Sequence, residues 1–329
     1  MTEPNLRPVL EAETRNASGD SSRKLRQGLL TVLRAVVSIG LLWLVARRLS
    51  LADLQERSAA LSTTALLVAA VILALVTILS SLRWRKVCAS TSGRIGLISA
   101  WRVLMISTAM DQFVFTMSGD AFRIWWLTGR SPSLTHALGS TVLDRIVGVF
   151  GLILLMAAGL PALMLSEAAG SLIWVPVAMS TAGLAGLGLL LALPSLPLPA
   201  FPLKGNLLLI SLAARRLFFR PHFALPAIAA AVGVHLGVAL AIAAIGSAIG
   251  VSVSFVWYLL VTPSVLMVTL LPISIGGWGV REAAMVVGLG IAGVGHNDAL
   301  LISVVFGLLV AGIGVAGVLT WLFGIPGRS

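Results

Sequence analysis

This sequence has few charged residues. Asp, Glu, Lys and Arg together make up 11% of its 329 residues, whereas hydrophobic residues make up 58% and the mean hydropathy is +1.03. A soluble domain is usually about a quarter charged. A water-soluble fold could not bury so large an apolar fraction, so lipid must be the solvent for much of the chain. These proportions predict an all-α fold, a polytopic integral membrane helical bundle.

Cysteine and acidic residues are also scarce. The one cysteine, Cys88, excludes an intramolecular disulfide, and no CxxC motif or Cys/His cluster supports a metal site. The sequence has no Walker motif for ATP hydrolysis. We therefore expect no metal, no cofactor and no catalytic residues.

Basic residues outnumber acidic ones by 23 to 12, which gives a net charge of +11. In a soluble protein such a balance would suggest a nucleic-acid partner. Here the bases flank apolar segments, as they do in cytoplasmic loops that face anionic headgroups. We expect no nucleic-acid binding.

Apolar stretches long enough for membrane segments recur along the chain, because a helix needs about 20 apolar residues to span a bilayer. The expected segments are 28–46, 64–82, 97–117, 143–165, 171–193, 223–250, 254–271, 280–294 and 298–324. They form a single domain over 28–324 with about seven to nine membrane segments. Residues 1–27 lack an apolar run and predict a disordered cytoplasmic tail, and 325–329 form a short tail.

The distribution of bases predicts the orientation. The stretches 83–102 and 195–222 carry bases and no acid, whereas the turn at 166–170 carries only Glu167. The positive-inside rule places the two basic stretches in the cytoplasm. The N-terminus is then cytoplasmic as well, and we expect a multi-pass protein of the bacterial inner membrane.

Two stretches do not fit a simple crossing. The stretch 97–142 enters from the cytoplasm and must return there, yet Asp111 interrupts it and few apolar residues follow Met117. Either 103–130 is a re-entrant hairpin, or two short helices meet inside the membrane. A Gly-rich break at Ile273–Gly279 leaves 273–294 equally open between a re-entrant segment and a full span. Broken backbone at membrane depth persists only where it is buried in protein or lines a wet cavity, so both breaks are functional candidates.

The two breaks resemble each other. Met117-Ser-Gly-Asp-Ala-Phe-Arg123 and Ile275-Gly-Gly-Trp-Gly-Val-Arg281-Glu282 place Gly119 opposite Gly277 and Arg123 opposite Arg281 at one spacing. Glycine-interrupted helices at matching positions of an internal repeat indicate a transport site at the repeat interface. A two-fold repeat would divide the domain into halves of about 28–165 and 171–324, although Gly and Ala are abundant enough here that chance resemblance stays open.

Each break has the groups of an anion site. Glycine lets the backbone break, and helices starting near Asp120 and Val280 would present free N–H groups and positive dipole ends. Arginine adds donors suited to phosphate. The neighbouring carboxylates keep the arginines paired in lipid, but such pairs could instead only lock helices together. The predicted substrate-binding residues are Gly119, Asp120, Arg123, Asp144, Arg145, Gly276, Gly277, Gly279, Arg281 and Glu282.

Four motifs carry a family resemblance. They are Leu82-Arg83-Trp84-Arg85, Gly119-Asp120-x-x-Arg123, Leu143-Asp144-Arg145 with Gly148, and Pro272-x-Ser274-x-Gly276-Gly277-x-Gly279-x-Arg281-Glu282. With these motifs the chain resembles, over about 28–324, the lysylphosphatidylglycerol-synthase transmembrane-region family, and it is similar to the flippase portion of bacterial multiple-peptide-resistance factors. Members usually carry a Pro-rich and Gly-rich lead into Gly-Gly-Asp, where this chain has Phe115-Thr-Met-Ser-Gly-Asp120.

The family's aminoacyl transfer belongs to a separate soluble domain, so the resemblance implies lipid translocation without synthase activity. The leading hypothesis is a flippase that is not an enzyme. Arg123 and Arg281 would hold phosphate, and Asp120, Asp144 and Glu282 would orient them or bind a cationic headgroup.

Two alternatives to a flippase stay open. One is an integral-membrane lipid-modifying enzyme, such as a glycosyltransferase, and the other is a non-catalytic subunit of a lipid-synthesis complex. Membrane lipids are the expected partners, and lipid-biosynthesis enzymes are further candidates. The sequence does not fix the oligomeric state.

Overall fold

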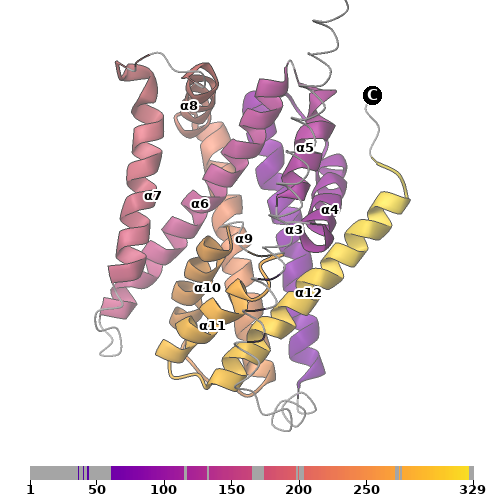
Figure 1. The fold of residues 1–329 in the computed structure, drawn as a ribbon, viewed down its shortest axis with the longest axis vertical. Coiled ribbons are helices and arrows are strands. Elements are labelled where there is room, and N and C mark those ends of the chain that lie inside the picture. The colour runs from indigo at the N-terminus through magenta and orange to yellow at the C-terminus, as the bar shows by residue number, and fades with distance from the viewer. Residues whose placement is uncertain are drawn as a thin grey trace, which may run out of the picture.

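The computed structural model describes residues 61–114, 117–131, 133–164, 174–197, 199, 204–270, 274 and 276–325, and the helical positions 36, 40 and 43. Every regular element in these ranges is a helix (Figure 1). The helices are α3 (Thr63–Thr91), α4 (Leu97–Phe113), α5 (Ser118–Thr128), α6 (Leu134–Met164), α7 (Trp174–Ala192), η2 (Leu193–Ser195), α8 (Lys204–Phe218), α9 (Pro221–Ala248), α10 (Phe255–Thr269), α11 (Val280–Ile291) and α12 (His296–Leu322).

The predicted all-α membrane bundle is confirmed. Five of the described helices are long and apolar enough to cross a membrane: Thr63–Thr91, Leu134–Pro161, Trp174–Ser195, Pro221–Ala248 and His296–Leu322. The predicted tail at 1–27, most of the first predicted segment at 28–46, and 326–329 lie outside the described residues.

The boundaries of two crossing helices differ from the prediction. α3 continues to Thr91, so the stretch from Arg83 to Thr91, expected in a loop, is helical. α6 begins at Leu134 rather than near 143. The prediction ends each helix where basic and polar residues end the apolar run. A helix can continue past that point if its next turns pack against other helices. The longer α3 places Arg83 inside the bundle.

Four shorter helices form two hairpins that reach only part of the way through the molecule. In Figure 1, α4 and α5 lie in the upper half, whereas α10 and α11 lie in the lower half. α5 has 11 residues and α11 has 12, so at 1.5 Å per residue they are about 16 and 18 Å long. A bilayer core is about 30 Å thick. These short second helices favour re-entrant hairpins over full spans at both breaks.

The helix pairings around the two hairpins correspond. α3 packs along α9, while α4 packs against α12 and α10 against α6. The hairpins point in opposite directions (Figure 1), as in an inverted-topology repeat, with α7, η2 and α8 inserted between α6 and α9. The division into halves at 165 and 171 stays a prediction.

Each hairpin has its own apolar core. The upper core is built around Trp84 of α3 and Trp126 of α5, both fully buried, with ring centroids 6.0 Å apart. The lower core includes Ile245 of α9, Met285 of α11 and Ile302 of α12. The upper and lower hairpins thus pack into two separate apolar cores.

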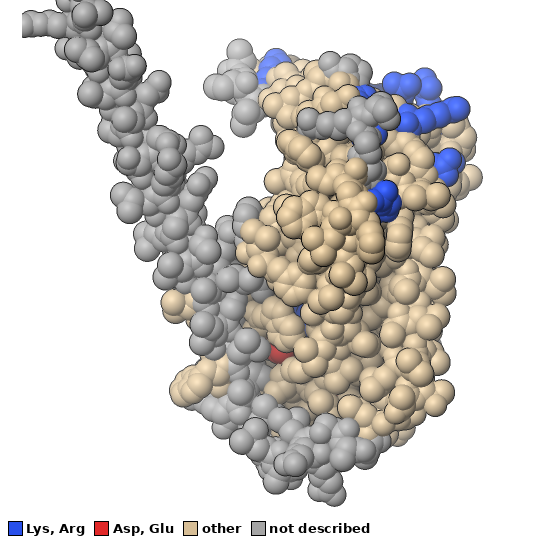
Figure 2. Space-filling view, turned by 90° about the vertical axis from the view of Figure 1, so that its right-hand side faces the viewer, with Lys and Arg blue, Asp and Glu red and all other residues tan. Residues whose placement is uncertain are grey.

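The two ends of the bundle differ in charge. Figure 2 shows Lys and Arg gathered at the upper end. α8 lies at this end and is seen end-on in Figure 1, so it runs across the long axis of the bundle, and its last turn carries Arg215 and Arg216. At the opposite end the described stretches 245–258 and 289–300 contain no Lys or Arg.

Candidate functional site: charged side chains at two hairpin tips

Five charged side chains from three helices form one network, here called the upper charge cluster: Arg83 of α3, Asp120 and Arg123 of α5, and Asp144 and Arg145 of α6. The Asp144 carboxylate accepts hydrogen bonds from Arg83 Nε (2.8 Å) and Arg123 Nη2 (2.7 Å). The Asp120 carboxylate accepts from Arg123 Nη1 (3.2 Å) and Arg145 Nε (2.9 Å). Bases and acids therefore alternate along the network. Arg83 completes it and is not among the predicted site residues.

Asp144 is the most buried member of this cluster; the Arg83 side chain on one side of it is 13% exposed, and burial falls along the other side towards Arg145. The exposed fraction of the side chain is 1% for Asp144, 5% for Arg123, 13% for Asp120 and 40% for Arg145. Removing one partner of a buried ion pair typically costs about 3–5 kcal/mol, so Arg123 and Asp144 hold α5 to α6. Arg145, the most exposed member, is the one best placed to bind a further group.

Aromatic and small residues enclose the buried arginines. The Arg123 guanidinium lies 4.7 Å from the ring centroid of Trp84, a cation–π contact. A Cβ on Gly148 would come within 3.2 Å of Arg83 Nη1. Gly148 thus makes space for Arg83 between α3 and α6.

The N-terminus of α5 is occupied by the chain itself. Asp111 of α4, the acid that interrupts an apolar stretch, accepts a hydrogen bond from the Gly119 N–H through Oδ1 (2.9 Å). A Cβ on Gly119 would lie 2.8 Å from Asp111 Oδ2 and even closer to the Ser107 carbonyl oxygen. The sequence predicts free N–H groups here, but α4 and α5 are packed so tightly that a carboxylate from α4 caps α5.

The lower hairpin carries a smaller network, here called the α11 ion pair: Arg281 and Glu282. Glu282 Oε1 accepts from Arg281 Nη2 (2.6 Å) and Nε (3.0 Å) and from Ser303 Oγ of α12 (3.3 Å). Glu282 Oε2 accepts from the Gly279 N–H at the start of α11 (2.6 Å). Glu282 is 0% exposed and Arg281 4%, and the guanidinium lies 4.6 Å from the Trp278 ring centroid. Glu282 therefore both caps α11 and neutralises Arg281.

Aligning the two breaks by the first residues of α5 and α11 matches different residues from the alignment made on the sequence. Met117 (φ 80°) precedes α5 and Gly279 (φ 86°) precedes α11, both with left-handed backbone. Asp120 and Glu282 are then the third residues of their helices. In this register Arg123 has no arginine opposite it, because Arg281 lies in the first turn of α11 and Arg123 in the second turn of α5. The two hairpins are alike in backbone and unlike in charge.

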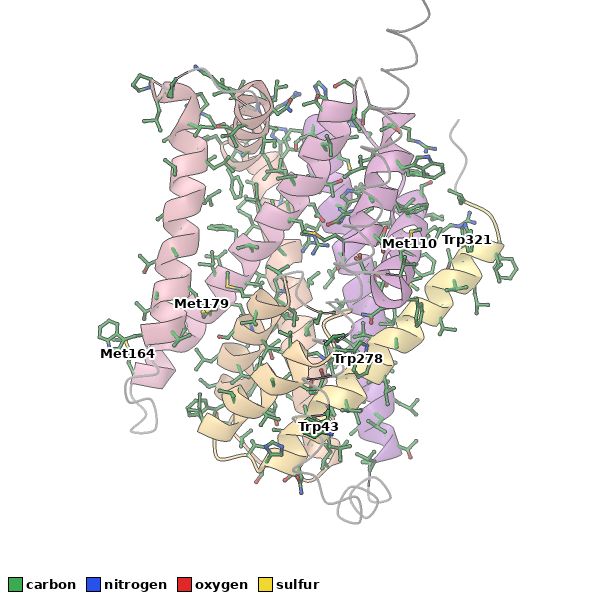
Figure 3. The ribbon with its side chains drawn as sticks, viewed as in Figure 1. Trp43, Met110, Met164, Met179, Trp278 and Trp321 are labelled. Carbon is green, nitrogen blue, oxygen red and sulfur yellow. The ribbon has the colours of Figure 1, made fainter. Side chains whose placement is uncertain are left out.

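The tips of the hairpins meet at α4. A Cβ on Gly276 would lie 3.3 Å from Gln112 Oε1 and 3.5 Å from the Gln112 carbonyl oxygen. Asp111, the residue before, contacts the other break through Gly119. Gly276, Gly277 and Gly279 all have positive φ, which lets the lower tip turn sharply against α4. Figure 3 labels Trp278 within this lower tip.

Gln112 is a contact that the sequence did not reveal. Its Oε1 is buried and has no hydrogen-bond partner among the described residues. A buried amide oxygen without a partner is uncommon, because leaving it unpaired costs about 1–3 kcal/mol. No hydrogen bond or ion pair between described residues joins the upper charge cluster to the α11 ion pair. The binding of phosphate by Arg123 and Arg281 stays a prediction.

Three apolar cavities lie beside the hairpins and α6, and one of them reaches the upper charge cluster. One of about 260 Å³ lies between α6 and α7 and is lined by Arg145 together with Val149, Phe150 and Gly183. A second, of about 670 Å³, lies between α4, α5 and α12 and includes Met110 and Trp321, which Figure 3 labels.

The third apolar cavity, of about 500 Å³, lies between α7, α10 and α11. Each hairpin thus borders a cavity large enough for part of an acyl chain. Neither Arg123 nor Arg281 lines any of these three cavities.

Comparison with known families identifies the class of protein. Residues 31–317 match the family described as lysylphosphatidylglycerol synthase TM region. The chain belongs to this family. The match spans nearly the whole chain and includes all of the predicted site residues, so both hairpins are part of the family's shared region. It is therefore a multi-pass membrane protein of a family named for a membrane lipid. No curated protein and no solved structure matches the chain.

Proposed function

We propose that this family member moves a phospholipid or another lipid-linked molecule with an anionic or zwitterionic headgroup from one leaflet to the other, without covalent chemistry. One observation carries the proposal: two half-length hairpins enter the bundle from opposite ends, meet at Gln112 and Gly276, and each encloses a charged network. Broken helices that meet at the interface of inverted repeats are where many transporters bind their substrates.

The headgroup would bind first at Arg145. This arginine is the most exposed member of the upper charge cluster, and it lines the apolar cavity between α6 and α7. A guanidinium beside an apolar cavity matches a phosphate that is attached to an acyl chain. Phosphate would replace Asp120 as the partner of Arg145, and Asp120 would keep its bond to Arg123.

Passage between the leaflets would require the hairpin tips to separate. The Gln112–Gly276 contact includes a buried amide oxygen with no hydrogen bond to lose, so opening this contact is inexpensive. The acyl chains would remain in the apolar cavities beside each hairpin while the headgroup crosses. The Gln112 amide then becomes available as a polar contact for the headgroup.

We also propose that the basic upper end faces the cytoplasm of a bacterial cell, in the inner membrane. The positive-inside rule supports this, because Lys and Arg gather at the upper end, whereas the described stretches 245–258 and 289–300 at the lower end contain none. The N-terminus would be cytoplasmic as well.

Transport is tested by reconstituting the purified full chain into liposomes that carry a fluorescent phosphatidylglycerol in both leaflets. Dithionite bleaches the outer leaflet, so translocation shows as bleaching of the protected inner-leaflet fraction. We expect wild-type protein to expose that fraction, and Arg145→Gln to slow exposure at least tenfold. The matched control is Arg85→Gln, an exposed arginine of α3 outside the cluster.

Two results would overturn the proposal. If wild-type protein leaves the inner-leaflet lipid protected and instead yields a modified lipid by mass spectrometry, the chain is an enzyme. If Arg145→Gln and Arg85→Gln transport equally, Arg145 does not bind the headgroup. Thermal unfolding of each variant in detergent shows whether a loss of transport reflects a loss of folding.

A further inference from the structure

A separate small cavity lies beneath α8 at the basic end of the bundle. It has a volume of about 190 Å³ and is enclosed by the end of α3, the start of α6 and one face of α8. Its lining includes Thr91 of α3, His136 of α6, and Leu209, Leu212 and Arg216 of α8. Arg145 lies further along α6, in the cavity shared with α7. The α8 cavity is therefore outside the proposed transport site.

Ser90, Thr91 and Thr135 line this cavity with hydroxyl groups, and Ser92 and Ser140 extend the hydroxyl network outside the lining. Thr91 Oγ1 and Ser140 Oγ are 2.6 Å apart, and Ser92 Oγ also pairs with Ser140 and donates to the His136 carbonyl oxygen (3.0 Å). The His136 Nδ1 lies 2.8 Å from Ser133 Oγ, which fixes the imidazole ring. These bonds tie α3 to the first turns of α6 and hold the wall in place without using Arg216.

The charge of the α8 cavity favours an anion. Arg216 is exposed, and it has no acidic partner among the described residues. His136 is the other ionisable group in the lining, which contains no carboxylate. A guanidinium and an imidazole at the rim of a hydroxyl-lined cavity are donors that suit phosphate.

The apolar half of the lining favours the phosphate of a lipid over a free phosphate ion. Leu209 and Leu212 are 47% and 52% exposed, on a helix that lies across the bundle axis at its basic end. An amphipathic helix in this position lies in the membrane interface, with its leucines toward acyl chains and its bases toward headgroups. A free phosphate ion would gain nothing from the leucines, whereas a phospholipid would contact both halves.

We propose that the α8 cavity binds the phosphate of an anionic phospholipid from the leaflet at the basic end. Arg216 and His136 would contact the phosphate, and Leu209 and Leu212 would contact the upper part of an acyl chain. Such a lipid would tie α8 to the ends of α3 and α6. This site does not depend on transport, since none of its residues belongs to either charged network.

The test is native mass spectrometry of the purified full chain, released from detergent micelles after titration with phosphatidylglycerol. All proteins carry Arg145→Gln, which removes the proposed transport site from the measurement. We expect the added Arg216→Gln to weaken lipid binding at least fivefold. Arg220→Gln, which removes an exposed arginine outside the cavity lining, is the matched control and should bind as the background protein does.

Two further arms identify the ligand. Glycerol phosphate at a hundredfold excess should not displace the lipid, because it lacks the acyl chains, and diacylglycerol should not bind, because it lacks the phosphate. Equal lipid binding by the Arg216→Gln and Arg220→Gln proteins would overturn the proposal. Full displacement by glycerol phosphate would also overturn it, since the site would then belong to a water-soluble phosphate. Because Arg216 is exposed, Arg216→Gln should not change the temperature of thermal unfolding. This measurement shows that the variant is folded.

Discussion

The guanidinium of Arg281 lies against α12 at a position where only glycine fits. A Cβ on Gly307 would lie 2.8 Å from Arg281 Cζ and 2.9 Å from Trp278 Cη2. We expect Gly307→Ala to push Arg281 away from Glu282 and to destabilise the protein by about 1–3 kcal/mol, the usual cost of overpacking. Thermal unfolding in detergent, followed by tryptophan fluorescence, measures this loss.

The control for this substitution lies on the same helix. A Cβ on Gly312 would have no neighbour within 4 Å. Gly312→Ala should therefore leave stability unchanged or raise it by up to about 1 kcal/mol, the helix preference of alanine over glycine. If the Gly307→Ala and Gly312→Ala proteins unfold at the same temperature, Arg281 does not pack closely against Gly307 of α12.

Met117 is the one described non-glycine residue with positive φ, 80°, directly before α5. A left-handed backbone conformation costs a residue with a Cβ about 1–2 kcal/mol, and glycine avoids this cost. Glycine also has more conformational entropy in the unfolded chain, which cancels part of the gain in stability. We expect Met117→Gly to raise the free energy of unfolding by about 0.5–1 kcal/mol. Met117→Val should lower it, because a β-branched side chain tolerates this conformation least. Denaturation in detergent gives the order, and a more stable valine variant would contradict the strained backbone.

Some members of the two networks could be found from the sequence and others could not. Charged residues beside glycines in apolar surroundings are rare enough to identify Asp120, Arg123 and Glu282. The basic neighbours Arg85 and Lys86 predict a loop at Arg83, and only packing shows that α3 continues past it. Gln112 gave no signal, because an uncharged amide in a mixed stretch becomes notable only when its burial and missing partner are known.

At the scale of elements, the sequence located both breaks but could not choose between re-entrant and full-length segments. Local hydrophobicity is the same in either case, since both place apolar helices in lipid. The deciding facts are long-range: α4 packs against α12 and α10 against α6, so each hairpin turns back within the bundle. α8 was also unpredicted, because a basic and proline-rich stretch resembles a loop until its amphipathic face is packed.

A disulfide between α4 and α12 tests whether the upper tip must move. The Cβ position of Gly314 lies 3.5 Å from the Gln112 Cβ, within the range that a disulfide spans. We expect Gln112→Cys/Gly314→Cys to crosslink on oxidation, to stop lipid translocation, and to recover it after reduction with dithiothreitol. Thiol alkylation followed by mass spectrometry confirms the crosslink.

Each single cysteine variant serves as a control for the pair. Gln112→Cys alone loses the amide contact and should translocate lipid more slowly than wild type, but oxidation should change the rate of neither single variant. The native Cys88 stays out of the chemistry because it is fully buried. A crosslinked protein that moves lipid at the rate of the reduced protein would show that the tip of α4 stays in place during transport.

For the whole molecule, the charge difference between the ends predicts which end faces the cytoplasm. Arg94→Cys places a thiol at the exposed basic end, and Gly295→Cys places one at the exposed opposite end. In intact bacterial cells we expect a membrane-impermeant maleimide to label Gly295→Cys and to spare Arg94→Cys until the cells are broken. The reverse pattern would invert the proposed orientation.

The unequal charge of the two hairpins has a consequence for energetics. The upper charge cluster has three guanidinium groups and two carboxylates, and Asp111 faces the positive end of α5, whereas the α11 ion pair is balanced. In the proposed orientation, an anion would therefore rest more favourably in the cytoplasmic half and leave more readily from the other. A cell whose interior is electrically negative assists that exit by about 2.3 kcal/mol per elementary charge for each 100 mV. Voltage alone would then enrich an acidic lipid in the outer leaflet, whereas a zwitterionic one would only equilibrate.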